Sequence, residues 1–386
     1  MPATLLSEVV KLSICIITLS IGTGFLQAIE PATGRMGFLA EKLRQGESIS
    51  AGFLGGSITQ GSGASSHSKC YYWLTRTWLS KEAEKRGSSS KSLLAAVGGT
   101  NSTYGAFRVG GQLLDKDIDL LIIEFAVNDY SSKEAAAAME GIVRQAWTRN
   151  PQMGIVFLYT TSNRINQTHY AKGDMPPSVR QHHQIAEHYG IVEVNAGKAA
   201  ATAITDGDYS SQEFFKDGTH PTDIGHAFYA KHLQEALLPL LDLPMPTETP
   251  ILPVPIVSDR FEYARMLPLS PDDMEGHWTY KEPDYYNYLG RYVTEEPGAR
   301  VSCSYEGSLY GLLVVKATPF VCQGSALKRQ ELKTGGRPDR IPVMIKTASL
   351  DAAVPEKHQI WIEVPPDPDT KPHVELSALL YFNLPQ

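Results

Sequence analysis

Cysteine is scarce in this chain. Only four cysteines occur among its 386 residues, so a fold held together by many disulfide bonds is excluded. The cysteines and histidines do not have the spacing of a zinc site. Cys303 and Cys322 lie in neighbouring strand-like runs and could form one disulfide if the protein leaves the cytoplasm. Cys70 would then stay free.

Long basic runs are absent as well. The chain has 35 lysine and arginine residues against 42 aspartate and glutamate residues, and its net charge is -7. A protein that binds nucleic acid would carry a basic patch or stripe. We therefore expect no nucleic-acid partner.

The N-terminal region lacks a run that is long enough to span a membrane. Its apolar segment, residues 12–26, follows Lys11 and is shorter than the roughly 18–20 residues that a membrane-spanning helix needs. This pattern predicts a secretory signal peptide over residues 1–28, with cleavage near Ala28. An uncleaved N-terminal anchor is the alternative. We expect a secreted or extracytoplasmic protein, periplasmic or extracellular, with no stable membrane span after cleavage.

Apolar runs alternate with helical patterns from residue 48 to residue 241, and this alternation predicts a parallel sheet covered by helices. The runs are continuously apolar, as is typical of strands buried on both faces. The strand-like runs are residues 48–54, 92–97, 118–127, 153–159 and 190–196. The helical segments are approximately residues 69–86, 104–114, 132–149, 177–189 and 222–241.

The composition changes after residue 241, and a chain of 386 residues is in any case long enough for two domains. We assign residues 29–243 to the α/β domain and the Pro-rich residues 244–258 to an extended linker. Short β-prone runs separated by Gly, Pro and Asp fill residues 259–386. They predict an antiparallel β-sandwich.

A glycine-rich stretch follows the first predicted strand. In the sequence FLGGSITQG, residues 53–61, Gly55 and Gly56 stand directly before Ser57. Glycine leaves room where another molecule must approach the backbone, and ligands bind at the carboxyl ends of parallel strands. Ser57 is therefore a candidate nucleophile, and a tight turn with a structural serine is the alternative.

A serine nucleophile needs a base and a group that orients the base. The sequence DGTH places Asp217 and His220 three residues apart, just before the last helix of the domain. A loop can bring the Asp217 carboxylate to one ring nitrogen of His220 while the other nitrogen faces outward. Asp217 could instead only cap the turn before Thr222.

The oxyanion that forms during ester hydrolysis needs hydrogen-bond donors. Asn128, after the third strand, offers a side-chain amide, and Gly99, after the second strand, offers an unobstructed backbone N–H. The N–H of Ser57 could be a third donor, and Gly98 is an alternative to Gly99. An Asx turn is the alternative role for Asn128.

Several neighbouring polar residues are interpreted without a catalytic role. Asp129 and Tyr130 follow Asn128 and are expected to be structural. His226 lies on the last helix, away from the site, and His182 and His183 are expected at the surface.

Four blocks in this order resemble those of the SGNH hydrolases, also called the GDSL esterase/lipase family. The blocks are GGSIT with Ser57, VGGTN with Gly99, AVND with Asn128 and DGTHP with His220. The resemblance covers roughly residues 48–241. It implies a flavodoxin-like three-layer α/β/α fold, ester hydrolysis without metal or cofactor, and a triad of Ser57, His220 and Asp217.

The chain departs from the family pattern at two positions. Gly56 replaces the usual Asp before the serine, and Ala126 replaces the Gly two residues before the asparagine. Neither position supplies a reacting group, and the changes indicate a divergent branch. The lipase-type G-x-S-x-G elbow is absent because Thr59 stands where its second Gly belongs.

The sequence thus predicts a secreted serine esterase that acts on a small-molecule or polysaccharide ester, preferably an O-acetyl group on carbohydrate. One alternative is an esterase or lipase for small or lipid esters. Another is a non-catalytic carbohydrate-binding or adhesion protein built on a hydrolase scaffold.

Overall fold

The computed structural model describes most of the chain. The described residues are 23–284, 288–325, 327–334, 343–346, 357–365 and 372–383, with the backbone alone for 23–33, 328 and 343. Residues 1–22 lie outside these ranges, so the signal peptide over residues 1–28 stays a prediction. No helix in the described part of the chain is both long and apolar enough to cross a bilayer.

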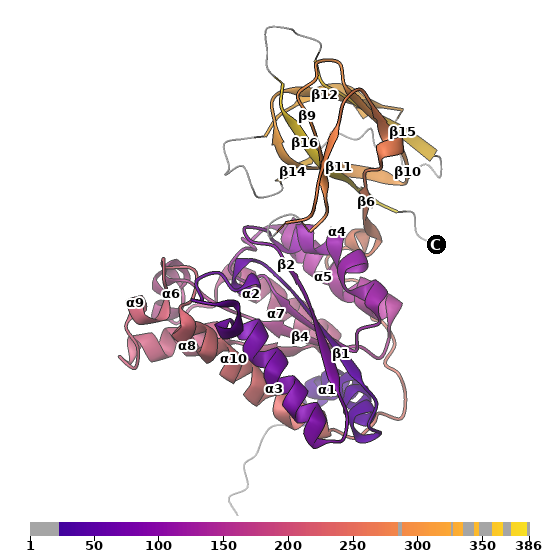
Figure 1. The fold of residues 1–386 in the computed structure, drawn as a ribbon. Helices are drawn as coiled ribbons and strands as arrows, with labels where there is room; N and C mark the ends of the chain where they lie inside the picture. Colours follow the sequence, from indigo (N-terminus) through magenta and orange to yellow (C-terminus); the bar gives the residue numbers. More distant parts are fainter. Residues whose placement is uncertain are drawn as a thin grey trace, which may run out of the picture.

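The first part of the chain is built on a five-stranded parallel sheet (Figure 1). Its strands are β1 (Ile49–Gly55), β2 (Ser90–Ala96), β3 (Leu120–Glu124), β4 (Gly154–Leu158) and β5 (Val192–Val194). Their spatial order is β2-β1-β3-β4-β5, the flavodoxin-like order. The predicted fold class is confirmed. Every residue of β1, β3 and β4 is buried, which explains their continuously apolar sequences.

Helices cover both faces of this sheet. They are α1 (Thr23–Arg44), α2 (Ser57–Gln60), α3 (Tyr71–Lys85), α4 (Ser102–Gln112), α5 (Lys133–Arg149), α6 (Asn163–Thr168), α7 (Pro177–Tyr189), α8 (Ala196–Thr205), α9 (Ser211–Phe214) and α10 (Asp223–Leu237). Side chains of α4, α5 and α7 pack on one face of the sheet, and those of α1, α3, α8 and α10 pack on the other. An apolar core lies on each face of the sheet, and successive strand residues point to opposite faces. Phe53 and Ile122 pack in one core, and Leu54 and Ile123 pack in the other.

The C-terminal part is an antiparallel β-sandwich, as predicted. Its strands are β6 (Ala264–Pro268), β7 (Met274–Glu275), β8 (Thr279–Lys281), β9 (Arg291–Thr294), β10 (Arg300–Glu306), β11 (Ser308–Ala317), β12 (Phe320–Gly324), β13 (Leu327–Leu332), β14 (Val343–Lys346), β15 (Lys357–Glu363) and β16 (Val374–Phe382). One sheet has the order β13-β12-β15-β10-β7, and the other has the order β14-β11-β16-β9-β8, with β6 paired to β16. A separate apolar core fills the space between them.

The disulfide between Cys303 and Cys322 is not formed, because both thiols are free and buried. Cys303 lies on β10 and Cys322 on β12, and β15 is hydrogen-bonded between these two strands. Strands two places apart are separated by about 9–10 Å, whereas a disulfide needs Cα atoms within about 7 Å. The two strands are neighbours neither in sequence, where β11 lies between them, nor in the sheet, where β15 does. Cys70 is free, as expected.

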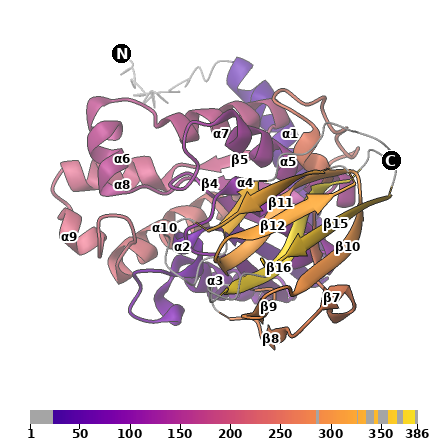
Figure 2. The same cartoon turned by 90° about the horizontal axis from the view of Figure 1, so that it is seen from above.

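The sandwich packs on α4 and α5 of the α/β domain. Four aromatic rings form the centre of this contact: Phe107 of α4 lies 5.8 Å from Phe261, 4.8 Å from Tyr310 and 5.3 Å from Phe382, measured between ring centroids. Seen from above, the sandwich lies over α4 and α5, whereas α6, α8 and α9 extend beyond it (Figure 2). A cavity of about 680 Å³ lies at the same interface, but none of the predicted site residues lines it.

A second contact reaches the start of α5. The Glu134 carboxylate accepts hydrogen bonds from the Tyr310 hydroxyl over 2.8 Å and from Lys346 Nζ over 2.5 Å. Glu134 is six residues after Asn128 in sequence. The sandwich is therefore bonded to the segment that follows the third block.

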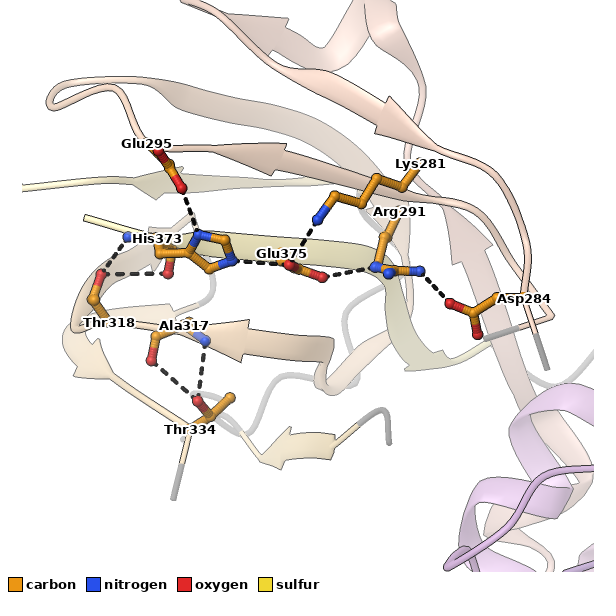
Figure 3. A network of polar contacts seen from close by, with 9 residues as sticks. All are labelled: Lys281, Asp284, Arg291, Glu295, Ala317, Thr318, Thr334, His373 and Glu375. Carbon is orange, nitrogen blue, oxygen red and sulfur yellow. Dashed lines mark hydrogen bonds and ion pairs between the residues drawn. The ribbon is translucent and has the colours of Figure 1, made fainter. Parts of the chain in front are cut away.

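Charged side chains join the strands at one end of the sandwich (Figure 3). Glu375 of β16 is bonded to Arg291 Nε at 2.7 Å, to Lys281 Nζ at 3.1 Å and to His373 Nε2 at 2.9 Å. Burial opposes ionisation of Glu375, but the bonds from these three groups outweigh it and lower the pKa of the carboxyl. His373 also contacts Glu295 through Nδ1, so the network fixes β8, β9 and β16 together.

The Pro-rich segment, residues 244–258, lies along the α/β domain. Glu140 of α5 is fully buried and accepts hydrogen bonds from the backbone N–H groups of Ile256, Val257 and Ser258 at 2.7–2.8 Å. It also accepts one from the Tyr189 hydroxyl. Further upstream, Arg144 and Arg35 donate to the carbonyl oxygens of Pro253 and Pro250.

Replacing Glu140 should therefore weaken the whole protein. In Glu140→Ala, three backbone N–H groups lose their charged acceptor, and we expect the free energy of unfolding to fall by about 2–3 kcal/mol. Urea denaturation measures this loss. Glu187→Ala, which removes an exposed carboxylate from α7, is the control. An equal loss in both variants would contradict the anchoring role.

Candidate active site

Ser57 is the first residue of α2, directly after β1 and Gly56. The glycines are needed for close approach. A Cβ on Gly56 would lie 2.6 Å from Oδ1 of Asn128, and a Cβ on Gly98 would lie 2.9 Å from Oε1 of Gln60 and in ordinary contact, at 3.6 Å, with Cβ of Ser57. The turn thus brings Ser57 against both the second and the third predicted block.

His220 lies between Ser57 and Asp217. Its Nε2 is 2.8 Å from Ser57 Oγ, and its Nδ1 is 2.7 Å from Asp217 Oδ2. The other carboxylate oxygen of Asp217 accepts the backbone N–H groups of Thr219 and His220 at 3.0 and 2.8 Å. Gly218 permits this turn because its φ is +81°. The chain places these three groups as a nucleophile, a base and an orienting carboxylate must lie.

The Asp217 carboxyl is strongly biased towards its ionised form. Partial burial raises its pKa, but the hydrogen bonds from the His220 ring and from the two backbone N–H groups outweigh this effect. The result is a pKa of about 2. Asp217 therefore keeps its negative charge next to the His220 ring at neutral pH and far below it.

The loop after α2 packs on the turn that carries His220. Gly63 lies against the Pro221 carbonyl and the His220 Cβ, with no room for a side chain. Asp223 fixes this loop: its carboxylate accepts the N–H and the hydroxyl of Ser65 at 2.7 Å and pairs with Lys69. These bonds lower the pKa of Asp223.

His226 supports the same loop without touching Ser57. It is fully buried, its Nδ1 accepts the Tyr71 N–H at 3.3 Å, and its Nε2 lies 3.1 Å from the Ser62 carbonyl. Burial lowers its pKa to about 4, so the ring is neutral at neutral pH and carries one N–H.

Gly99 and Asn128 both lie beside the nucleophile turn. Gly99 has a φ of +72°, which favours glycine. The N–H of Gly98, the alternative donor, already donates to Gln60 Oε1 at 2.9 Å. Among the described residues, neither the backbone N–H of Gly99 nor the side-chain amide of Asn128 has a hydrogen-bond partner. Both groups can therefore bind a ligand.

Two buried charged groups beneath the site were missed by the sequence analysis. Glu124, at the end of β3, accepts hydrogen bonds from Thr59 Oγ1 at 2.9 Å and from Thr160 Oγ1 at 2.7 Å, and burial raises its pKa. Arg108 of α4 donates to the carbonyls of Gly55 and Ala95 at 2.8 and 2.6 Å. A charged residue inside an apolar run, as in LLIIE, is the signal that could have identified Glu124.

Two interpretations of neighbouring residues were wrong. His182 is buried, not at the surface: its Nε2 is 2.9 Å from Asp129, whose other oxygen accepts the Ser102 N–H. The histidine packs inward because α7 places it over the sheet beside Phe157. Tyr130 does not pack as a structural residue, since 70% of it is exposed.

No cluster of three or more His, Cys, Asp or Glu side chains in the described ranges could hold a metal ion.

Residues 53–228 match the model of the GDSL-like lipase/acylhydrolase family. The matched residues lie within the α/β domain and form a GDSL-like domain. The match includes Ser57, Gly99, Asn128, Asp217 and His220, and it confirms the family resemblance and the class of carboxylic ester hydrolase. It does not test the divergent branch.

Two crystal structures of a two-domain esterase (CEX) described as active on acetylated mannans are similar to the GDSL-like domain and the sandwich together. One, co-crystallised with mannopentaose, has 22% identity and a TM-score of 0.74, and the other has 21% identity and a TM-score of 0.75. Each covers 93% of this chain and 97% of its own. At this identity the likeness shows a shared fold. A search of curated proteins gave no match.

The decrease of activity on the acid side should reflect protonation of His220 and not of Asp217. Protonated His220 cannot accept the Ser57 proton, whereas Asp217, with a pKa of about 2, stays ionised. We expect kcat/KM to fall with the loss of a single ionisation as the pH is lowered. A pH series of initial rates with an aryl acetate measures it. A decrease in kcat/KM that depends on the uptake of two protons would contradict the assignment.

Proposed function

We propose that this chain is a metal-free serine esterase that removes short acyl groups, mainly O-acetyl groups, from carbohydrate outside the cytoplasm. The observation that carries this proposal is the alignment of Ser57 Oγ, His220 Nε2 and Asp217 at 2.8 and 2.7 Å. This alignment also disfavours a non-catalytic binding protein, for which no such geometry is required.

In the proposed mechanism, His220 Nε2 takes the proton from Ser57 as Oγ attacks the acyl carbon. The tetrahedral intermediate collapses, and the protonated His220 gives the proton to the departing sugar oxygen. Ser57 then carries the acyl group as an ester. Water, deprotonated by His220, attacks this ester and releases the carboxylic acid and free Ser57. Asp217 stabilises the charged imidazole in both halves of the reaction.

The proposed oxyanion hole is formed by the Ser57 N–H, the Gly99 N–H and the Asn128 amide. The Ser57 N–H is in the first turn of a helix, where backbone donors have no partner within the helix. Donors that already point at the developing charge need no reorganisation during the reaction. The proposed chemistry needs no metal, because His220 and these donors supply both the base and the charge stabilisation.

Carbohydrate is the preferred substrate class for three reasons. The segment 160–177, which follows β4 at the carboxyl edge, is polar and carries Asn163, Arg164 and His169. The sandwich is bonded to the segment after Asn128 through Glu134. The CEX esterase with the same two-domain fold is described as active on acetylated mannans. Small or lipid esters remain the second candidate, because the family includes lipases.

The single variants Ser57→Ala and His220→Ala should each remove nearly all esterase activity. The two groups act as one unit, so the double variant should be little worse than either single variant. Initial rates with an aryl acetate measure the activity of each variant, and circular dichroism confirms that the variants are folded. Losses that multiply in the double variant would contradict a shared mechanism.

The rate should fall steeply from aryl acetate to aryl octanoate. A short polar pocket gains nothing from added methylene groups, whereas an apolar tunnel would gain about 0.8 kcal/mol for each buried CH₂. A kcat/KM that rises with acyl length would favour the lipase.

We also expect the enzyme to release acetate from acetylated polysaccharides equally well with and without EDTA. Loss of this activity with EDTA would overturn the metal-free mechanism.

A further inference from the structure

The Tyr130 side chain is the most exposed aromatic group among the described residues, at 70%. Single exposed apolar side chains are common and need no explanation. The position of this one is unusual, because it follows Asn128 and Asp129 at the carboxyl end of β3. Asp129 is buried and fixed by Ser102 and His182, so the backbone that carries Tyr130 is anchored on its inner side.

The guanidinium of Arg164 lies over the Tyr130 ring, with Cζ 5.9 Å from the ring centroid. Arg164 belongs to α6, which is itself fixed to the turn of the triad. The Asn163 N–H donates to the Gly218 carbonyl over 2.8 Å, and the Asn163 side chain bonds Ser211. Tyr130 and Arg164 therefore connect the loop of the oxyanion donor Asn128 to the turn between Asp217 and His220.

The chemistry of this pair does not suit an acyl chain. A fatty chain would gain from contact with the ring but would have to desolvate the guanidinium beside it. A sugar ring presents an apolar face of C–H groups and a rim of hydroxyl groups. An aromatic ring can stack on the apolar face, while the planar guanidinium offers five N–H donors to the hydroxyl oxygens.

We propose that Tyr130 and Arg164 form a carbohydrate subsite at the mouth of the active site. In this subsite, the face of a neutral pyranose ring of the esterified carbohydrate stacks on Tyr130, and Arg164 donates to its hydroxyl groups. The inference rests on the proposed function and adds residues that determine substrate choice. It assigns saccharide recognition next to the reacting ester to the α/β domain itself.

The test compares two substrates in the same variants. Aryl acetate measures the Ser57 chemistry, and acetylated manno-oligosaccharide measures the same chemistry plus recognition of sugar. For Tyr130→Ala we expect KM for the oligosaccharide to rise about tenfold, as for loss of one stacking contact, with a much smaller change on aryl acetate. Tyr130→Phe should retain most of the affinity, because it keeps the ring. Arg164→Ala should resemble Tyr130→Ala.

Trp361→Ala is the matched control. Trp361 is an exposed aromatic on β15, in the sheet of the sandwich that does not pair with β6 or β16. It should leave both activities unchanged. A rise in KM for Trp361→Ala equal to that for Tyr130→Ala would place recognition on the sandwich and overturn the subsite.

The remaining outcomes separate the subsite from the proposed function. Equal losses on both substrates in Tyr130→Ala would show that Tyr130 positions Asn128, and no loss on either would show that Tyr130 does not contact the substrate. Each of these results overturns the subsite alone. A wild-type enzyme that hydrolyses aryl acetate but no acetylated carbohydrate would overturn the carbohydrate substrate together with the subsite.

Discussion

The arrangement at the carboxyl edge of the parallel sheet depends on buried charges that hold strand ends together. Arg108 donates to Gly55, the last residue of β1, and to Ala95, the next-to-last residue of β2, so the turns that carry Ser57 and Gly99 leave the sheet at a fixed separation. Glu124 joins the helix of Ser57 to the end of β4 through Thr59 and Thr160. Burial lowers the pKa of Arg108 to about 10, which leaves the guanidinium charged at neutral pH.

Much of this edge could be predicted from the sequence, because parallel strands bring their following loops to the same side. The positions of Ser57, His220 and Asp217 followed from this rule and from the chemistry of their side chains. The sequence does not show strand order in an antiparallel sheet, so Cys303 and Cys322 were assigned to adjacent strands although β15 separates them. The helices α1 and α8 were not predicted: the first residues of α1 fall in the segment 1–28 that was assigned to a signal peptide, and α8 begins directly after the short strand β5.

The residues next to the candidate catalytic residues were the hardest to interpret from the sequence. His182 lies in a polar stretch, QHHQ, yet it is buried against Phe157 and bonded to Asp129, which is 53 positions away in sequence. Tyr130 shows the reverse case: an aromatic residue is expected to pack inside, yet its neighbour Asp129 occupies the inward position and leaves the ring outside. In both cases the side chain's environment is set by contacts that are distant in sequence.

The bonded course of residues 244–258 has a consequence for how the two domains can share a ligand. A flexible linker lets a tethered domain move through a volume that depends on the linker length. This volume sets the effective concentration of the second domain near a ligand that is bound to the first. Here Glu140, Arg144 and the Phe107 contact remove that freedom. A polymer that contacts both domains must therefore fit a fixed angle and a fixed spacing between them. The shape of the polymer, and not the number of polymer molecules nearby, would decide whether both contacts form.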